Sequence, residues 1–173
     1  MIWLRQLDLQ LRALVPFASA LVAVLIDVAP LVGTGPIGLS SFATLCAVYF
    51  WSLYRPDLLT PSAAFLIGLV YDGLAGLPLG LTSLALLLVR SLMVTQQRFF
   101  LARSFPVIWC CFVLLAPAVE IARWLLSCLW WGHLFALEPA LLELLVTVAL
   151  YPPASWLLGR LHNQIPRLIH APS

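Results

Sequence analysis

Six long apolar segments take up most of this chain and limit the folds that it can adopt. A helix needs about 20 mostly apolar residues to cross the roughly 30 Å of hydrocarbon in a bilayer. Short connections rich in Gly, Pro or charged residues separate the segments. We expect spans at about residues 11–31, 37–54, 58–72, 79–95, 105–129 and 139–158, and a basic tail over residues 159–173. The predicted fold class is all-α: a polytopic membrane bundle of six transmembrane helices in a single domain, residues 1–173.

The composition indicates that lipid, rather than water, surrounds the sides of this bundle. Hydrophobic residues make up 63% of the 173 residues and charged residues 9%, and the mean hydropathy is +1.05. A soluble domain carries roughly a quarter charged residues. The formal net charge of +2 is too small to indicate a nucleic-acid partner.

Arginine is distributed unevenly about the six predicted spans. With six spans, eight of the nine arginines fall on one side of the membrane: Arg5, Arg12, Arg55, Arg90, Arg98, Arg103, Arg160 and Arg167. Five spans would divide them between the two sides. Because positively charged loops stay in the cytoplasm, the sequence predicts that both termini are cytoplasmic. Arg123, near the outer end of the fifth span, is the exception.

Aromatic residues gather toward both ends of the predicted spans. Tyr49, Trp51 and Tyr54 come at the cytoplasmic end of the second span, and Trp130 and Trp131 at the outer end of the fifth. Amphipathic rings prefer the interface between membrane and water. We therefore expect these side chains to lie at the two interfaces.

A run of regularly spaced small residues surrounds one acid. Gly68, Asp72, Gly76 and Gly80 recur every four residues, which would place them on one face of a continuous helix. Pro78 and the density of glycine predict instead that the helix breaks after about Asp72, which leaves a closely packed turn before the fourth span. An intramembrane acid usually has a specific partner. We favour a structural role for Asp72, in which it satisfies loop amides, over substrate or ion binding.

Glu120 and Arg123 form a second polar pair, three residues apart on one helical face. Such a pair can persist in a low dielectric, although desolvation cancels much of its attraction. The pair either neutralises itself near the interface or forms a polar patch that contacts another protein or a headgroup. Asp27, Glu138 and Glu143 are further acids on the predicted outer side. A proton- or cation-handling cavity requires that such acids converge, which the sequence does not show.

The remaining reactive residues form no catalytic pattern. The four cysteines lie in or at the end of apolar stretches and form no CxxC pair, which favours small packing residues over a zinc site. His133 falls on the predicted outer side, and His162 and His170 fall in the tail, so the membrane separates them. No GxSxG sequence and no phosphate-binding loop occurs. We therefore expect no cofactor, no metal site and no enzymatic activity.

Two stretches resemble the MreD family of rod shape-determining integral membrane proteins. Residues 49–56, YFWSLYRP, resemble the aromatic Y-W-x-L-x-x-P stretch of that family. Residues 64–80, AFLIGLVYDGLAGLPLG, are similar to its F-x-x-G-L-x-x-D-x-x-x-G-x-x-x-G signature. A length near 170 residues without a soluble domain fits the same family. The resemblance covers about residues 49–88.

The resemblance implies a bundle similar to the substrate-binding subunits of energy-coupling-factor vitamin transporters. It also implies a multi-pass protein of the bacterial cytoplasmic (inner) membrane, a non-enzymatic scaffold of the cell-elongation machinery that helps to organise peptidoglycan synthesis and rod shape. The implied partners are MreC, the MreB filament, the glycosyltransferase RodA and its class B penicillin-binding protein transpeptidase, in addition to membrane lipids.

The candidate site residues fall into two groups under this interpretation. The polar contacts to a partner or within the bundle are Asp72, Glu120 and Arg123, and the close-packing turn comprises Gly68, Gly76, Pro78 and Gly80. The alternative is a small-molecule (vitamin-like) binding subunit of a membrane transporter. That function requires a pocket lined with aromatic residues and convergent polar groups.

Overall fold

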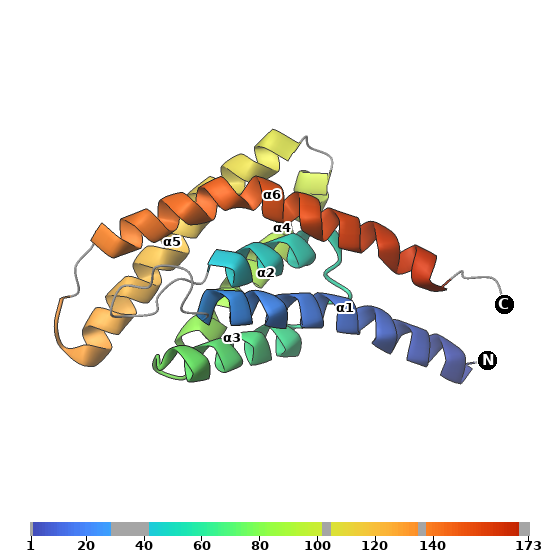
Figure 1. Cartoon of the computed structure of the whole chain (residues 1–173), viewed down its shortest axis with the longest axis horizontal. Coiled ribbons are helices and arrows are strands. Elements are labelled where there is room, and N and C mark those ends of the chain that lie inside the picture. The colour runs from blue at the N-terminus through green and yellow to red at the C-terminus, as the bar shows by residue number, and fades with distance from the viewer. Residues whose placement is uncertain (1, 29–41, 102–104, 135–137, 170–173) are drawn as a thin grey trace.

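A computed structural model describes residues 2–28, 42–101, 105–134 and 138–169 of the chain. These residues form six helices and no strand (Figure 1). The helices are α1 (Ile2–Val28), α2 (Phe42–Tyr54), α3 (Pro61–Ala75), α4 (Leu81–Leu101), α5 (Phe105–Trp131) and α6 (Glu138–Ile169). The all-α prediction is thus confirmed for the part of the chain that the structure describes. The predicted Gly- and Pro-rich connection after the first span lies outside these residues.

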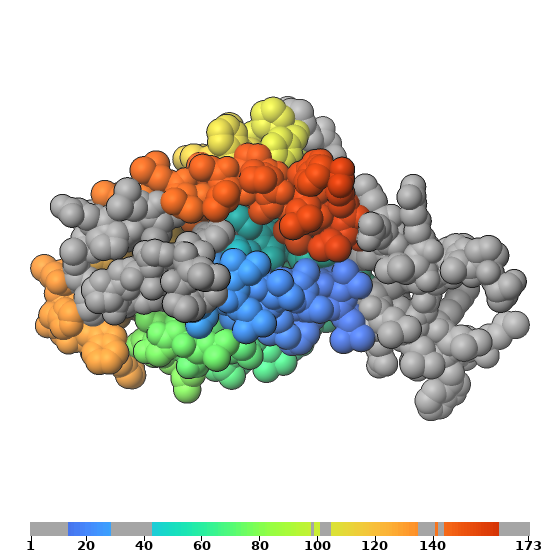
Figure 2. All heavy atoms as spheres, viewed as in Figure 1, coloured from blue at the N-terminus to red at the C-terminus, as the bar shows by residue number. Residues whose placement is uncertain are grey.

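Helix α2 occupies the centre of the molecule and packs against α1, α4 and α6. Helix α3 packs against α4 and α1, and α5 packs against α4 and α6. On the face that Figure 2 shows, α2 is visible only in a strip between α1 and α6. The N-terminal end of α1 and the C-terminal end of α6 lie on the same side of the molecule (Figure 1).

The central position of α2 follows from its sequence. Residues 44–53 are all buried, and they are apolar except for Thr44 and Ser52. A helix that is hydrophobic on every face is stable only where neighbours cover it on every face. The side chains of Tyr49 and Trp51, for which we predicted an interfacial position, thus face the inside of the bundle.

Hydrogen bonds and ring contacts hold these two aromatic side chains in the core. The Tyr49 hydroxyl donates to the carbonyl oxygen of Ile108 at 3.0 Å, and the Trp51 indole N–H donates to Ser19 Oγ at 2.9 Å. The Tyr49 ring also meets Tyr151 edge to face, with centroids 5.5 Å apart. Buried Tyr and Trp need such partners for their polar atoms.

The connection between α2 and α3 agrees with the local sequence signals. Helix α2 ends at Tyr54, directly before Arg55-Pro56-Asp57, and α3 begins at Pro61. The Thr60 side chain accepts a hydrogen bond from the backbone N–H of Ala63, which caps the helix. From α4, the Arg90 Nε donates to the Leu59 carbonyl oxygen at 2.7 Å and ties this connection to the bundle.

Helices α1 and α6 are longer than the spans that hydropathy predicts at the two ends of the chain. Helix α1 begins at Ile2, and α6 continues to Ile169, well into the predicted tail. Near its middle α6 contains Pro152 and Pro153 and is bent there (Figure 1). Proline removes a helical N–H and crowds the preceding turn, which bends a helix.

Two helical stretches among the described residues are long and apolar enough to cross a membrane, Phe105–Trp131 and Leu144–His162. The helices also carry many large apolar side chains on the outside, among them Leu88, Leu114, Leu129 and Trp130. Large exposed apolar patches mark sites of contact with membranes or with other proteins. These features fit a membrane location.

Candidate functional site

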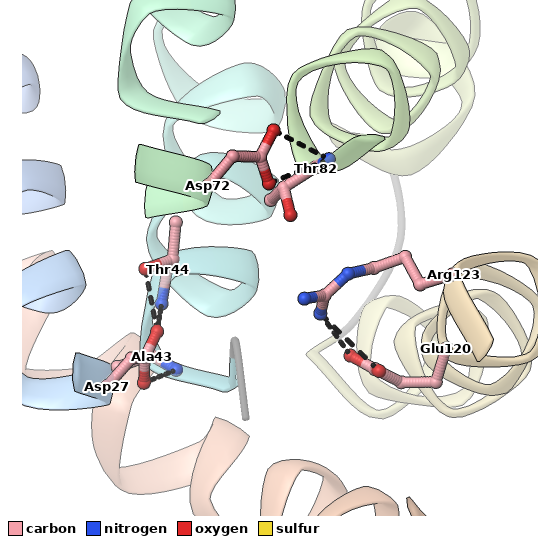
Figure 3. A network of polar contacts seen from close by, with 7 residues as sticks. All are labelled: Asp27, Ala43, Thr44, Asp72, Thr82, Glu120 and Arg123. Carbon is pink, nitrogen blue, oxygen red and sulfur yellow. Dashed lines mark hydrogen bonds and ion pairs between the residues drawn. The ribbon is translucent and has the colours of Figure 1, made fainter. Parts of the chain in front are cut away.

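Asp72 lies in the last turn of α3 and is completely buried. Its carboxylate accepts a hydrogen bond from the backbone N–H of Gly80 at 2.9 Å. It also accepts one from the backbone N–H of Thr82 at 3.1 Å (Figure 3). These amides belong to the start of α4, where backbone donors have no partner within the helix. The negative charge also lies at the positive end of the α4 dipole. Asp72 therefore caps the helix that follows its own.

The turn between α3 and α4 brings Asp72 into this position. Helix α3 ends at Ala75, three residues beyond the predicted break, because Gly76 adopts the left-handed conformation with φ of 69°. The backbone N–H groups of Gly76 and Leu77 both bond to the Asp72 carbonyl oxygen, a common helix ending. Gly80 also has a positive φ, 101°. These two glycines allow the chain to reverse tightly, which returns the amides of α4 to the carboxylate of α3.

Gly68 serves a different purpose within α3. A Cβ atom at this position would lie 2.4 Å from Ser83 Cα and 2.6 Å from the Ser83 nitrogen. The backbones of α3 and α4 therefore meet directly, as small residues permit between membrane helices. Gly68 belongs to the interface between two helices and not to the turn itself.

Asp27 forms a second cap that the sequence analysis did not identify as a site. Its carboxylate accepts from the backbone N–H of Ala43 at 3.0 Å and of Thr44 at 2.8 Å, and from Thr44 Oγ1 at 2.6 Å. Asp27 is at the end of α1, and the two amides are in the first turn of α2. The relation between Asp72 and α4 thus recurs between Asp27 and α2. An acid near the end of an apolar segment, with a threonine near the start of the next, is the shared signal.

Glu120 and Arg123 lie on the inward face of α5 and form an ion pair, with Arg123 Nη1 3.2 Å from Glu120 Oε1. The Arg123 side chain is 1% exposed, and its guanidinium lies over the ring of Tyr71, 5.4 Å from its centroid. A cation is attracted to the negative face of an aromatic ring. Tyr71 belongs to α3, so this side chain links α5 to the opposite part of the bundle.

The two caps and the ion pair surround one region of the interior. Figure 3 shows Asp72 with Thr82, Asp27 with Thr44, and the Arg123 guanidinium, which extends from α5 toward both caps. Arg123 is within electrostatic range of both aspartates. We call Asp27, Thr44, Asp72, Thr82, Glu120 and Arg123, together with Tyr71, the buried polar cluster.

The contacts of the buried polar cluster run between groups of the chain itself. Each aspartate faces the amides of a helix N-terminus, and the glutamate faces an arginine. Within the residues that the structure describes, no three His, Cys, Asp or Glu side chains group closely enough to hold a metal ion. Among the described acids, Glu120 is paired with Arg123, and Asp27 and Asp72 accept from backbone amides. The predicted polar contacts Asp72, Glu120 and Arg123 lie in this one cluster, whereas the side chains of Glu138 and Glu143 are outside the described part.

The fold and the cluster define a class of protein: a small all-helical membrane protein with several charged side chains buried inside its helical bundle. The chain belongs to the MreD family, because the family model for the rod shape-determining protein MreD matches residues 8–161. This match covers nearly the whole chain, far beyond the two resembling stretches. No curated protein and no solved structure matches the chain significantly. The family acts in rod-shape determination and is not a known enzyme family.

Proposed function

We propose that this protein is a non-enzymatic scaffold of the bacterial cell-elongation machinery, which binds MreC and helps to organise peptidoglycan synthesis. The observation that carries the proposal is the family match over residues 8–161. In this proposal RodA, its class B penicillin-binding protein and the MreB filament are further members of the same assembly.

We also propose that the chain crosses the inner membrane six times, with both termini in the cytoplasm. The six helices and the common side of the α1 start and the α6 end support this topology (Figure 1). Arg55 and Arg160 lie toward the ends of α2 and α6 that the proposal places in the cytoplasm, as the distribution of positive charge requires.

A scaffold in lipid binds its partner helices through close packing, because lipid provides no hydrophobic drive between helices. The outward face of α5 offers Leu114, Ile121 and Leu125, while its inward face carries the Glu120–Arg123 pair. The polar cluster thus supports binding indirectly in this proposal. The cluster fixes the orientation of α5 relative to the other helices, and the outward apolar side chains of α5 contact the partner helix.

The proposal is tested by deletion and by crosslinking. Deletion of the gene is expected to give rounded, widened cells, and a plasmid copy restores rods. In cells that carry a photo-reactive residue at Leu125 or, on another face, at Leu88, irradiation is expected to give an adduct with MreC at one position. Rod shape after deletion would overturn the proposed role. Failure to recover MreC, by crosslinking and in a mild-detergent pull-down alike, would overturn the proposed partner.

The alternative function, a vitamin-like binding subunit of a transporter, has one feature in its favour. A groove of about 490 Å³ lies between α2, α6 and the start of α5, within the usual size range of small-molecule sites, about 300–1,000 Å³. Thermal-shift screening with vitamins would support this alternative if one compound stabilised the protein specifically.

A further inference from the structure

The groove between α2, α5 and α6 is built by local features of the chain. Its lining comes from the last turns of α2, the first residue of α5 and the second half of α6: Phe50, Tyr54, Phe105, Pro152, Ser155, Trp156, Gly159 and His162. Helix α6 is bent near its middle (Figure 1), where its sequence contains Pro152 and Pro153, and Pro152 is part of the lining. A Cβ atom placed on Gly159 would meet nothing within 4 Å. The groove therefore depends on a bend and on a missing side chain.

Most of the groove is apolar and aromatic. Phe50 and Trp156 lie on opposite helices, and Phe105 lies at the start of α5. Phe105 and Trp156 are exposed, at 43% and 58%, so one side of the groove is open toward the surroundings of the bundle. An open apolar groove on the side of a membrane protein faces lipid, and an enclosed cavity would be expected for a water-soluble vitamin.

One end of the groove carries the polar side chain of His162, and two arginines lie beside residues of its lining. His162 Nδ1 is buried and has no hydrogen-bond partner among the described residues. The Arg160 guanidinium lies over the Trp156 ring, 3.8 Å from its centroid, and Arg55 is within electrostatic range of His162. Arg55 itself is paired with Asp57, which is exposed and 3.6 Å away. An exposed pair of this kind contributes little and can yield to another anion.

We propose that this groove binds an anionic phospholipid of the inner leaflet, with an acyl chain against the aromatic lining and the phosphate beside Arg160 and His162. Two observations determine this occupant. The apolar part is open on its side, and among the described side chains Arg160 and Arg55 lie toward the His162 end, which matches a molecule with an apolar chain and an anionic head. The inference rests on the proposed topology, which places this end at the cytoplasmic leaflet, where anionic lipids attract basic residues.

The first test fills the groove. The protein is purified in mild detergent, incubated with phosphatidylglycerol or with zwitterionic phosphatidylcholine, and examined by native mass spectrometry. The unmodified protein is expected to retain one phosphatidylglycerol at least fivefold more often than one phosphatidylcholine. Gly159→Leu, which places a side chain in the groove, is expected to lower retention of phosphatidylglycerol at least fivefold.

A matched control separates the groove from general effects of the substitution. Gly73→Leu adds the same side chain to another helical glycine with open space around it, on α3 and away from the groove. It is expected to retain the lipid as the unmodified protein does. Both variants replace a helical glycine with a strong helix former, so thermal melting should show that both remain folded. Equal retention by the Gly159→Leu and Gly73→Leu variants would overturn the proposed site.

The second test concerns the headgroup. Arg160→Gln is expected to remove most of the preference for phosphatidylglycerol over phosphatidylcholine while an acyl chain still binds. Equal retention of both lipids by the unmodified protein would overturn the anionic part of the proposal. Loss of MreC from a pull-down with Gly159→Leu, with lipid retention unchanged, would assign the groove to a protein helix instead. Because lipid retention and MreC recovery are measured separately, failure here is distinguishable from failure of the scaffold proposal.

Discussion

At the scale of single residues, Asp27 and Asp72 have the same role at two places in the chain: each caps the N-terminus of the following helix. Each is buried, and each accepts hydrogen bonds from amides at the start of the following helix. Lipid offers no alternative hydrogen-bond partner to a backbone amide, so an amide without a partner in the bundle destabilises the folded protein. The partial positive charge of the helix N-terminus in turn stabilises the carboxylate. The acid and the amides therefore stabilise one another.

Replacement of Asp72 by Ala is expected to destabilise the protein. Loss of a cap costs about 1–2 kcal/mol, and the amides of Gly80 and Thr82 remain without their partner. The measurement is thermal unfolding in detergent. Asp57→Ala is the control, because the Asp57 side chain is 73% exposed. Equal melting temperatures for the two variants would contradict the capping role.

The two threonines beside the caps provide a closely matched comparison. Thr44 Oγ1 donates to Asp27 at 2.6 Å, whereas Thr82 Oγ1 is buried without a hydrogen-bond partner among the described residues. Thr44→Val is therefore expected to cost about 1 kcal/mol more than Thr82→Val, since only the first loses a hydrogen bond. Chemical or thermal unfolding measures both. A Thr82→Val protein that is the less stable of the two would refute this assignment.

At the scale of helices, a direct backbone contact and a cation–π contact are among the features that join the elements. Gly68 allows α3 and α4 to touch, and Arg123 extends from α5 to Tyr71 on α3. Neither contact depends on the hydrophobic effect, which drives no association between helices in lipid. Close fit and polar contacts take its place.

Gly68→Ala is expected to destabilise the pair α3–α4. The added methyl group would collide with the Ser83 backbone, and such overpacking typically costs about 1–3 kcal/mol. Gly73→Ala is the control, since its methyl group would meet nothing within 4 Å. The control should equal or exceed the unmodified protein in thermal stability, because Ala is the better helix former. Similar losses in both variants would exclude the close approach as the cause.

The Glu120–Arg123 pair is expected to show strong coupling. Arg123→Met leaves a buried carboxylate without its cation, and breaking a buried pair in this way costs about 3–5 kcal/mol. Adding Glu120→Gln removes the negative charge that Arg123→Met leaves unpaired. The double variant should therefore regain much of the stability that the single variant loses. A double-mutant cycle on thermal unfolding measures the coupling energy. Strictly additive effects would show that the pair does not act as a unit.

At the scale of the whole molecule, local signals in the sequence predict more than long-range ones do. Arg55 and Pro56 directly follow the end of α2, and Pro61 is the first residue of α3, about three residues after the predicted start of that span; the backbone itself responds to proline. Hydropathy underestimates the lengths of α1 and α6, since a helix can continue beyond its apolar part. The burial of Tyr49 and Trp51 was missed because the same rings suit an interface and a core. The Asp27 cap was missed because its partner comes 16 or 17 residues later.

The proposed topology is expected to place the two chain ends on one side of the membrane. Proteins without the four native cysteines would carry a single cysteine through Ile2→Cys, His133→Cys or Ser173→Cys. In intact spheroplasts, an impermeant maleimide should label only the His133→Cys protein. After permeabilisation it should label all three. Labelling of only one chain end in intact cells would exclude an even number of spans.

The repeated aspartate caps also have a consequence for how the chain enters the membrane during synthesis. Each cap joins two consecutive helices, α1 with α2 and α3 with α4. Under the proposed topology, each helical hairpin therefore contains both a costly acid and the amides that satisfy it. In a hairpin that enters the bilayer as one unit, the hydrogen-bond donors of the carboxylate are already present, and no later segment is needed to supply them. The first four helices are thus suited to insertion two at a time, whereas α5, whose Arg123 reaches back to α3, completes its contacts only on a bundle that is already in place.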